Sequence, residues 1–215
     1  MTAGRRVDFV FDDGGMNLLS SAALRRIGQA LPDDASLFVF RSGRPSLFAA
    51  GADMAEMQRF TPWEAYEFAR LGQELFETIE RLPCLTVALI DGDCFGGALD
   101  LVLAFDLRFA TPRSRFAHPG ARLGIVTGFG GTSRWRSILS RRAANQLFLA
   151  NGVFPADEAL ELGLVDSVAE SHEDVLRGLD RRGDDLKLVK QLTVAATRRT
   201  RAQLLEMATW HQSPR

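Results

Sequence analysis

The chain has 215 residues, 46% of them hydrophobic, and a formal net charge of −1 at pH 7. This length and composition suit one globular domain with a sizeable core. The near-neutral charge argues against nucleic acid or an anionic membrane as partner, and no apolar run approaches the roughly 20 residues of a membrane helix. Arginines cluster at 134–142 and 198–201, and such clusters are expected on solvated helix faces.

Cysteine usage and the N-terminal residues indicate a cytoplasmic protein. Cys84 and Cys94 flank an apolar run without metal-ligand spacing, so we expect reduced core residues rather than a disulfide. The first 15 residues lack the apolar core and small-residue cleavage site of a secretory signal. No catalytic metal site and no nicotinamide fingerprint is expected.

Elements in the first half of the chain alternate between strand and helix. Residues 7–11 and 36–41 have strand character, and residues 21–31 place apolar side chains on one helical face. Thr61 and Glu64 form a capping box around Pro62, and an apolar stripe then runs to Pro83. This pattern predicts a long amphipathic helix.

The second half of the chain continues the alternation. Residues 85–90 predict a fully buried strand, residues 96–104 a short buried helix and residues 107–110 a further strand. We also expect helices from about 132, after 155 and over about 185–210, and a strand over 164–168. Strands that alternate with helices predict an α/β fold class.

Two adjacent glycines, Gly96 and Gly97, open the apolar helix that contains Asp100. A helix start leaves backbone N–H groups unpaired, and glycine lets another group approach them closely. The pair therefore indicates either tight packing or an oxyanion site.

Four blocks of sequence resemble the crotonase family of enoyl-CoA hydratases and isomerases, in family order. They are FAAGADMAEM (48–57), ALIDGDCFGGALDLVLAFDLRFAT (88–111), FAHPGARLGIVTGFGGTSR (116–134) and FPADEALELGLVDSV (154–168). The resemblance covers residues 17–168 and implies a crotonase-like α/β fold of repeated ββα units. It divides the chain into a core with an acyl-CoA pocket over 1–170 and a helical C-terminal region over 171–215, shorter than is usual for the family.

The resemblance also implies the site and the partners. Backbone N–H groups of Ala52 and Gly97 are expected to form an oxyanion hole for the thioester oxygen. Ala50, Asp53 and Met54 are expected beside the adenine and pantetheine portions of coenzyme A, and Gly96 and Gly120 are further expected substrate contacts. No separate cofactor is implied, because the acyl group arrives as its coenzyme A or acyl-carrier thioester, and the family assembles as homotrimers or hexamers.

The chain departs from the family at its carboxylates. Hydratases of the family use two glutamates, and this sequence has Asp100 and Gly120 at those positions; a third position that is aspartate in some relatives is Gly128. Asp100 is either a general acid/base or a first-turn carboxylate stabilised by the helix dipole. His118 is either a proton shuttle or a hydrogen-bonded structural residue.

Three functions follow from the resemblance. The first is a lyase of the enoyl-CoA hydratase or 3-hydroxyacyl-CoA dehydratase type, with Asp100 and His118 as its catalytic residues. The second is a divergent crotonase that decarboxylates, isomerises or dehydrates in a polyketide pathway. The third is an acyl-CoA-binding helper subunit with little catalysis of its own.

Overall fold

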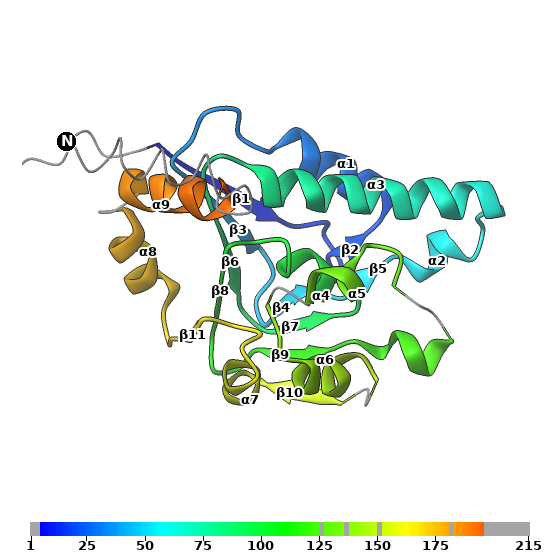
Figure 1. Ribbon diagram of the computed structural model, residues 1–215. Coiled ribbons are helices and arrows are strands. Elements are labelled where there is room, and N and C mark those ends of the chain that lie inside the picture. Colours follow the sequence, from blue (N-terminus) through cyan, green and yellow to red (C-terminus); the bar gives the residue numbers. More distant parts are fainter. Residues whose placement is uncertain (1–4, 125–126, 136–137, 150–151, 181–182, 196–215) are drawn as a thin grey trace, which may run out of the picture.

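The computed structural model describes residues 5–124, 127–135, 138–149, 152–180 and 183–195. A parallel five-stranded sheet forms its centre (Figure 1), in the order β1-β3-β6-β8-β11. Its strands are β1 (Arg6–Phe11), β3 (Leu37–Ser42), β6 (Leu85–Ile90), β8 (Leu107–Ala110) and β11 (Ser167–Val168). This arrangement confirms the α/β class.

A second sheet lies beside the first and has the order β10-β9-β7-β4. It contains β4 (Leu47–Ala49), β7 (Asp93–Phe95), β9 (Arg115–Ala117) and β10 (Val153–Pro155). The strands β4, β7 and β9 are parallel, and β10 runs antiparallel to β9. A short parallel pair joins β2 (Leu18–Leu19) to β5 (Gly51–Ala52).

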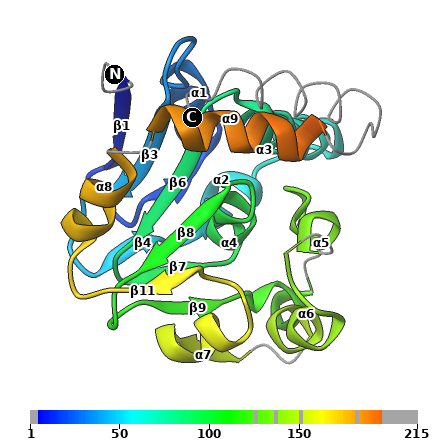
Figure 2. The same ribbon diagram turned by 60° about the vertical axis from the view of Figure 1, so that its left-hand side comes forward.

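Helices cover both faces of the five-stranded sheet. Figure 2 shows α8 (His172–Asp180) and α9 (Gly183–Ala195) on one side and α4 (Gly97–Val102) on the other. The remaining helices are α1 (Ser21–Gln29), α2 (Met54–Met57), α3 (Pro62–Arg81), α5 (Gly131–Arg134), α6 (Arg141–Phe148), α7 (Ala156–Glu161) and a 3₁₀ turn (Pro119–Leu123).

Alternating side chains of β3 divide between two apolar clusters. Phe38 and Phe40 join the larger cluster with α3 and α4, whereas Leu37 and Val39 join a smaller one with Leu176 of α8. Because both faces are covered, the strand is apolar throughout its buried part instead of alternating with polar residues.

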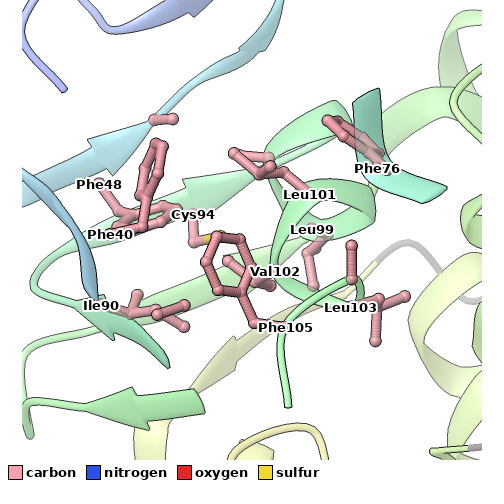
Figure 3. Close-up of a cluster of buried hydrophobic side chains, with 14 of the residues drawn as sticks. Phe40, Phe48, Phe76, Ile90, Cys94, Leu99, Leu101, Val102, Leu103 and Phe105 are labelled. Carbon is pink, nitrogen blue, oxygen red and sulfur yellow. The ribbon is translucent and has the colours of Figure 1, made fainter. Parts of the chain in front are cut away.

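The helix α4 lies inside the larger cluster. All residues from Ala98 to Val102 are buried, and Figure 3 shows Leu101 and Val102 among side chains of the neighbouring strands, including Phe40 and Phe48. Asp100 is therefore a carboxylate within a core helix.

The predicted long helix is confirmed with its capping box. Thr61 accepts a hydrogen bond from the N–H of Glu64, and the Glu64 carboxylate accepts one from the N–H of Thr61. Phe68, Leu75 and Phe76 of α3 are buried against the core, as the apolar stripe predicts.

Several predicted elements differ from the structure. The expected helix near 132 is the single turn α5. The expected strand over 164–168 is reduced to Ser167–Val168, because the N–H of Leu164 instead donates to Ala159 O at the end of α7. The helix α8, for which no separate bounds were predicted, lies within the expected helical C-terminal region. The expected closing helix begins at Gly183 and is described to Ala195; residues 196–210 lie outside the described residues.

The side chain of Arg134 corrects the expectation of a solvated arginine cluster. It is buried, donates a hydrogen bond to Phe129 O over 2.7 Å and lies 3.1 Å from Glu80. By contrast, Cys84 and Cys94 are free and buried, as predicted. Within the described parts of the chain, no helix has both the length and the apolar character needed to cross a membrane.

Candidate functional site

Three parallel strands of the second sheet end at one edge, where the candidate site lies. In the register of these strands, Ala49 of β4 lies beside Cys94 of β7, and Phe95 lies beside Ala117 of β9. The carboxyl ends of parallel strands are where α/β folds place ligands. The segments that follow are 50–52, the glycine pair 96–97 and His118.

The backbone segments at this edge touch one another. The N–H of Gly96 donates to Ala117 O over 2.8 Å. Gly51 has φ +98°, and a Cβ there would lie 2.7 Å from Phe95 O and 3.0 Å from Gly97 N. Only glycine fits at position 51, and its absent side chain brings the two segments together.

The two expected oxyanion amides are neighbours. A Cβ on Gly97 would lie 3.4 Å from the backbone nitrogen of Ala52. Gly97 is the first residue of α4, and the N–H of a first helical residue has no acceptor within its helix. The glycine pair therefore opens the helix beside a second backbone donor, as the oxyanion interpretation requires.

A cavity of about 300 Å³ lies over these amides. Most of its lining is apolar and comes from α2, α3 and the segments at the strand ends. Seven of the nine predicted site residues line it: Ala50, Ala52, Met54, Gly96, Gly97, His118 and Gly120. The structure thus brings most of the predicted site residues to this one cavity.

Two predicted residues, Asp53 and Asp100, are not part of the lining. The carboxylate of Asp53 caps α2 by accepting a hydrogen bond from the N–H of Glu56 over 3.0 Å. Its position is that of a helix cap, so its expected contact with coenzyme A has no geometric support beyond its proximity to Met54.

The carboxylate of Asp100 lies behind the cavity wall. Its residue is 0% exposed, and its Oδ2 accepts a hydrogen bond from the hydroxyl of Thr127. Its Oδ1 is 3.4 Å from His118 Nε2. A Cβ on Gly131 would overlap Oδ1, so the backbone of α5 closes the carboxylate from a third side.

Both polar atoms that face each other in this pair are buried and otherwise unsatisfied. Within the described residues, neither Asp100 Oδ1 nor His118 Nε2 has a hydrogen-bond partner of good geometry. The imidazole of His118 packs against Phe148 of α6, with ring centroids 4.9 Å apart. The ring is therefore held by an aromatic neighbour while its nitrogen faces a carboxylate.

The cavity wall formed by α3 and Phe129 was not predicted from the sequence. Phe129 lines the cavity and packs against Phe68, with ring centroids 5.1 Å apart. A Cβ on Gly72 would overlap the Phe129 ring, and one on Gly97 would lie 3.0 Å from it. A bulky aromatic between the glycines of GFGG (128–131) was the available signal.

Thr127 was also not predicted, although it lines the cavity and its hydroxyl donates a hydrogen bond to Asp100.

Cys94 lies near Asp100 and has no exposed surface. Burial, with Asp100 and Asp93 adding to it, raises the pKa of the Cys94 thiol well above its ordinary value, so this thiol is a poor nucleophile. Among the described residues, no three His, Cys, Asp or Glu side chains are grouped to hold a metal ion.

The fold is that of the crotonase class of α/β proteins. A crystal structure of enoyl-CoA hydratase from Geobacillus kaustophilus superposes with a TM-score of 0.86 at 22% identity, covering 96% of this chain and 84% of that one. An enoyl-CoA hydratase structure from Thermoplasma volcanium gives 0.84 at 23% identity, with 96% and 88% covered.

The chain belongs to the enoyl-CoA hydratase/isomerase family, whose model matches residues 16–210. It is 38% identical over 164 residues to a crotonyl-CoA hydratase of Syntrophomonas wolfei, covering 74% of this chain and 63% of that protein. It is 35% identical over 163 residues to a short-chain-enoyl-CoA hydratase of Clostridium acetobutylicum, covering 74% and 62%. The chain therefore spans somewhat less than two thirds of the length of these curated relatives.

Proposed function

We propose that this protein binds an acyl-CoA thioester and stabilises its enolate, as an enoyl-CoA hydratase or 3-hydroxyacyl-CoA dehydratase. The observation that carries the proposal is the pair of neighbouring backbone amides, Ala52 and Gly97, over which the apolar cavity lies. Two curated relatives are named as hydratases of crotonyl-CoA and of short-chain enoyl-CoA.

The amides would act on the charge that develops during the reaction. Adding water to an enoyl thioester moves electrons onto the thioester oxygen, and removing an α-proton from a 3-hydroxyacyl thioester does the same. Donors aimed at that oxygen lower the barrier, and one such donor typically contributes about 2.7–4 kcal/mol. The apolar lining strengthens this effect because it excludes water.

The chemistry of the cavity favours a second candidate, double-bond migration in an enoyl thioester. Among the described lining residues there is no carboxylate, and His118 is the ionisable side chain. Moving a proton between two carbons needs one exchanging group, whereas hydration also needs a water to be activated. Both reactions place negative charge on the thioester oxygen, hydration in a 3-hydroxyacyl enolate and migration in a dienolate.

Proton exchange at the carbon next to the carbonyl tests whether the protein stabilises an enolate. Butyryl-CoA in deuterium oxide should take up deuterium at the carbon next to the carbonyl when the protein is added, as measured by mass spectrometry. Crotonyl-CoA should in addition gain water, or its double bond should move, and the product distinguishes the two candidates. Binding without exchange would instead favour a helper subunit.

A matched ligand tests the oxyanion hole itself. Butyl-CoA, a thioether that lacks the carbonyl oxygen, should bind at least about 10-fold more weakly than butyryl-CoA, because two hydrogen bonds are lost. Equal affinity, measured by calorimetry, would contradict a role for the two amides.

The proposal extends to assembly and location. As the family resemblance implies, we propose a homotrimer or hexamer, which sedimentation equilibrium would test. The two free buried cysteines support a cytoplasmic protein.

A further inference from the structure

We propose that His118 is the residue that exchanges protons with the substrate, and that Asp100 and Thr127 act through it as positioning residues. This inference rests on the proposed function and assigns the roles within its site. It revises the simplest expectation from the sequence, in which Asp100 itself is the acid/base.

Contact with the cavity separates the two candidate groups, which are both buried. His118 lines the cavity, whereas Asp100 is 0% exposed and lies outside the lining. A general base must come within hydrogen-bond reach of the proton that it removes, directly or through one water. The imidazole meets this requirement for a ligand in the cavity, and the carboxylate does not.

Three contacts confine the Asp100 carboxylate. The Thr127 hydroxyl donates a hydrogen bond to Oδ2. The backbone at Gly131 packs against Oδ1, and His118 Nε2 lies 3.4 Å from the same oxygen. The carboxylate also sits on α4, whose side chains are packed into the core, so it cannot swing toward the substrate without moving the helix.

The position of two unsatisfied atoms facing each other beside the cavity supports a functional pair. A buried polar atom without a partner costs about 1–3 kcal/mol, and Asp100 Oδ1 and His118 Nε2 are two such atoms facing each other. Catalytic hydrogen bonds are often long without a ligand and shorten in the complex. With a proton on Nε2 directed at the carboxylate, Nδ1 would be the nitrogen that exchanges a proton with a ligand.

One imidazole can then serve both proton transfers of a dehydration. The unprotonated nitrogen of His118 takes the α-proton, and the C–H electron pair moves into the enolate, whose oxygen lies on the two amides. The imidazolium returns the proton to the leaving β-hydroxyl, the C–O bond breaks with its electrons to form water, and the enolate electrons form the double bond. The hydration reaction is the reverse.

A double-mutant cycle tests the assignment. His118→Ala should lower kcat by about 100-fold to 10,000-fold, the range for a general acid/base, with little change in the affinity for butyryl-CoA. Asp100→Asn should lower kcat by about 100-fold, as expected when a catalytic group is misplaced. In the His118→Ala background, Asp100→Asn should cause no further loss, because a positioning residue has nothing left to position.

Two further readouts separate positioning from a structural role. Imidazole added to His118→Ala should restore at least 10-fold activity, whereas it should not rescue Asp100→Asn. Thr127→Val should lower kcat, and Thr127→Ser, which keeps the hydroxyl, should remain near wild type. His172→Ala, a histidine on α8, is the matched control and should leave activity unchanged.

The outcomes distinguish this inference from the proposed function. If the wild-type protein exchanges no α-proton of butyryl-CoA, the proposed function is overturned and this assignment with it. If the wild type exchanges and His118→Ala still does so at the wild-type rate, only the assignment is overturned. Equal losses from Asp100→Asn with and without His118 would show that Asp100 acts directly on the substrate.

Discussion

Two clusters of polar side chains, each built around buried members, differ in how completely their hydrogen bonds are made. The first, which we call the sheet cluster, comprises Thr86, Asp106, Arg108, Asp166 and Lys190. Asp106 Oδ2 accepts from the N–H of Thr86 over 2.7 Å and lies 2.7 Å from Lys190 Nζ. Arg108 donates to two backbone carbonyls and lies 3.1 Å from Asp166.

The second, the site cluster, comprises Asp100, Thr127 and His118. One oxygen of Asp100 is hydrogen-bonded and the other faces an imidazole nitrogen without a good bond. Fully satisfied buried networks rigidify a fold, whereas a buried group left unsatisfied marks strain, catalysis or a site for water or an ion. The contrast separates the polar residues that hold the sheet from those that we assign to chemistry.

The largest expected effect is on stability, in the sheet cluster. Arg108→Met should lower the free energy of unfolding by about 3 kcal/mol, because it leaves the carbonyls of Leu164 and Phe105 without their donor. Asp166 loses the guanidinium but keeps its bond from the N–H of residue 108. The activity of the folded fraction should not change.

Asp100→Asn should lower activity but not stability. Its free energy of unfolding in urea should stay within about 1 kcal/mol of wild type. Equal destabilisation by both changes would remove the contrast.

The next effect tests the closure of the site cluster. Gly131→Ala introduces a Cβ that overlaps Asp100 Oδ1 and should lower kcat by about 100-fold, since a displacement near 1 Å has that consequence. Gly178→Ala is the matched control, because no atom lies within 4 Å of the Cβ it would add. Steady-state kinetics on both variants checks the prediction, and full activity in Gly131→Ala would contradict it.

A smaller effect is expected on acyl-chain preference. Phe129 closes the cavity against Phe68 and Phe76, so Phe129→Ala should extend the cavity. Each additional buried methylene contributes about 0.8 kcal/mol, so kcat/KM for longer thioesters should rise about 4-fold per methylene relative to wild type. A series of enoyl-CoA chain lengths gives the ratio, and an unchanged chain-length profile would exclude Phe129 from this role.

The smallest effect concerns a surface pair outside both clusters. The bonds to Arg113 and to Thr111 hold the pKa of Asp91 below its usual value. Its contribution to stability is therefore present above the unfolded pKa and is lost as the pH falls through the folded pKa. Asp91→Asn should slightly lower the melting temperature at neutral pH and bring it close to wild type in acid. A shift of equal size at both pH values would contradict this origin.

Local sequence signals predicted the parts of the fold that local physics determines. The apolar run of β6 (Leu85–Ile90), the strand β8 (Leu107–Ala110) and the capping box of α3 were all predicted close to their observed bounds. The three-residue strands β7 and β9 were not, because so short a run has no distinct period and depends on its neighbours.

The candidate site was predicted as far as the backbone and the resemblance allow. The glycine pair and Ala52 indicated two amides, and they are neighbours in the structure. The seclusion of Asp100 could not be predicted, because it depends on Thr127 and Gly131, which are distant in sequence and reach the carboxylate only through tertiary packing. Contacts of this kind leave no periodic signal.

The ion pair between Arg115 and Asp93 lies at the surface, but it affects the position of His118 in the catalysis that we propose. These residues are paired in the register of β9 and β7, and the Arg115 guanidinium donates two hydrogen bonds of 2.7 Å to the Asp93 carboxylate. A slip of β9 by one residue would carry His118 about 3.3 Å along the strand, away from both Asp100 and the glycine pair. This salt bridge therefore favours the register that places His118 beside Asp100, and the proton transfer that we propose depends on that register.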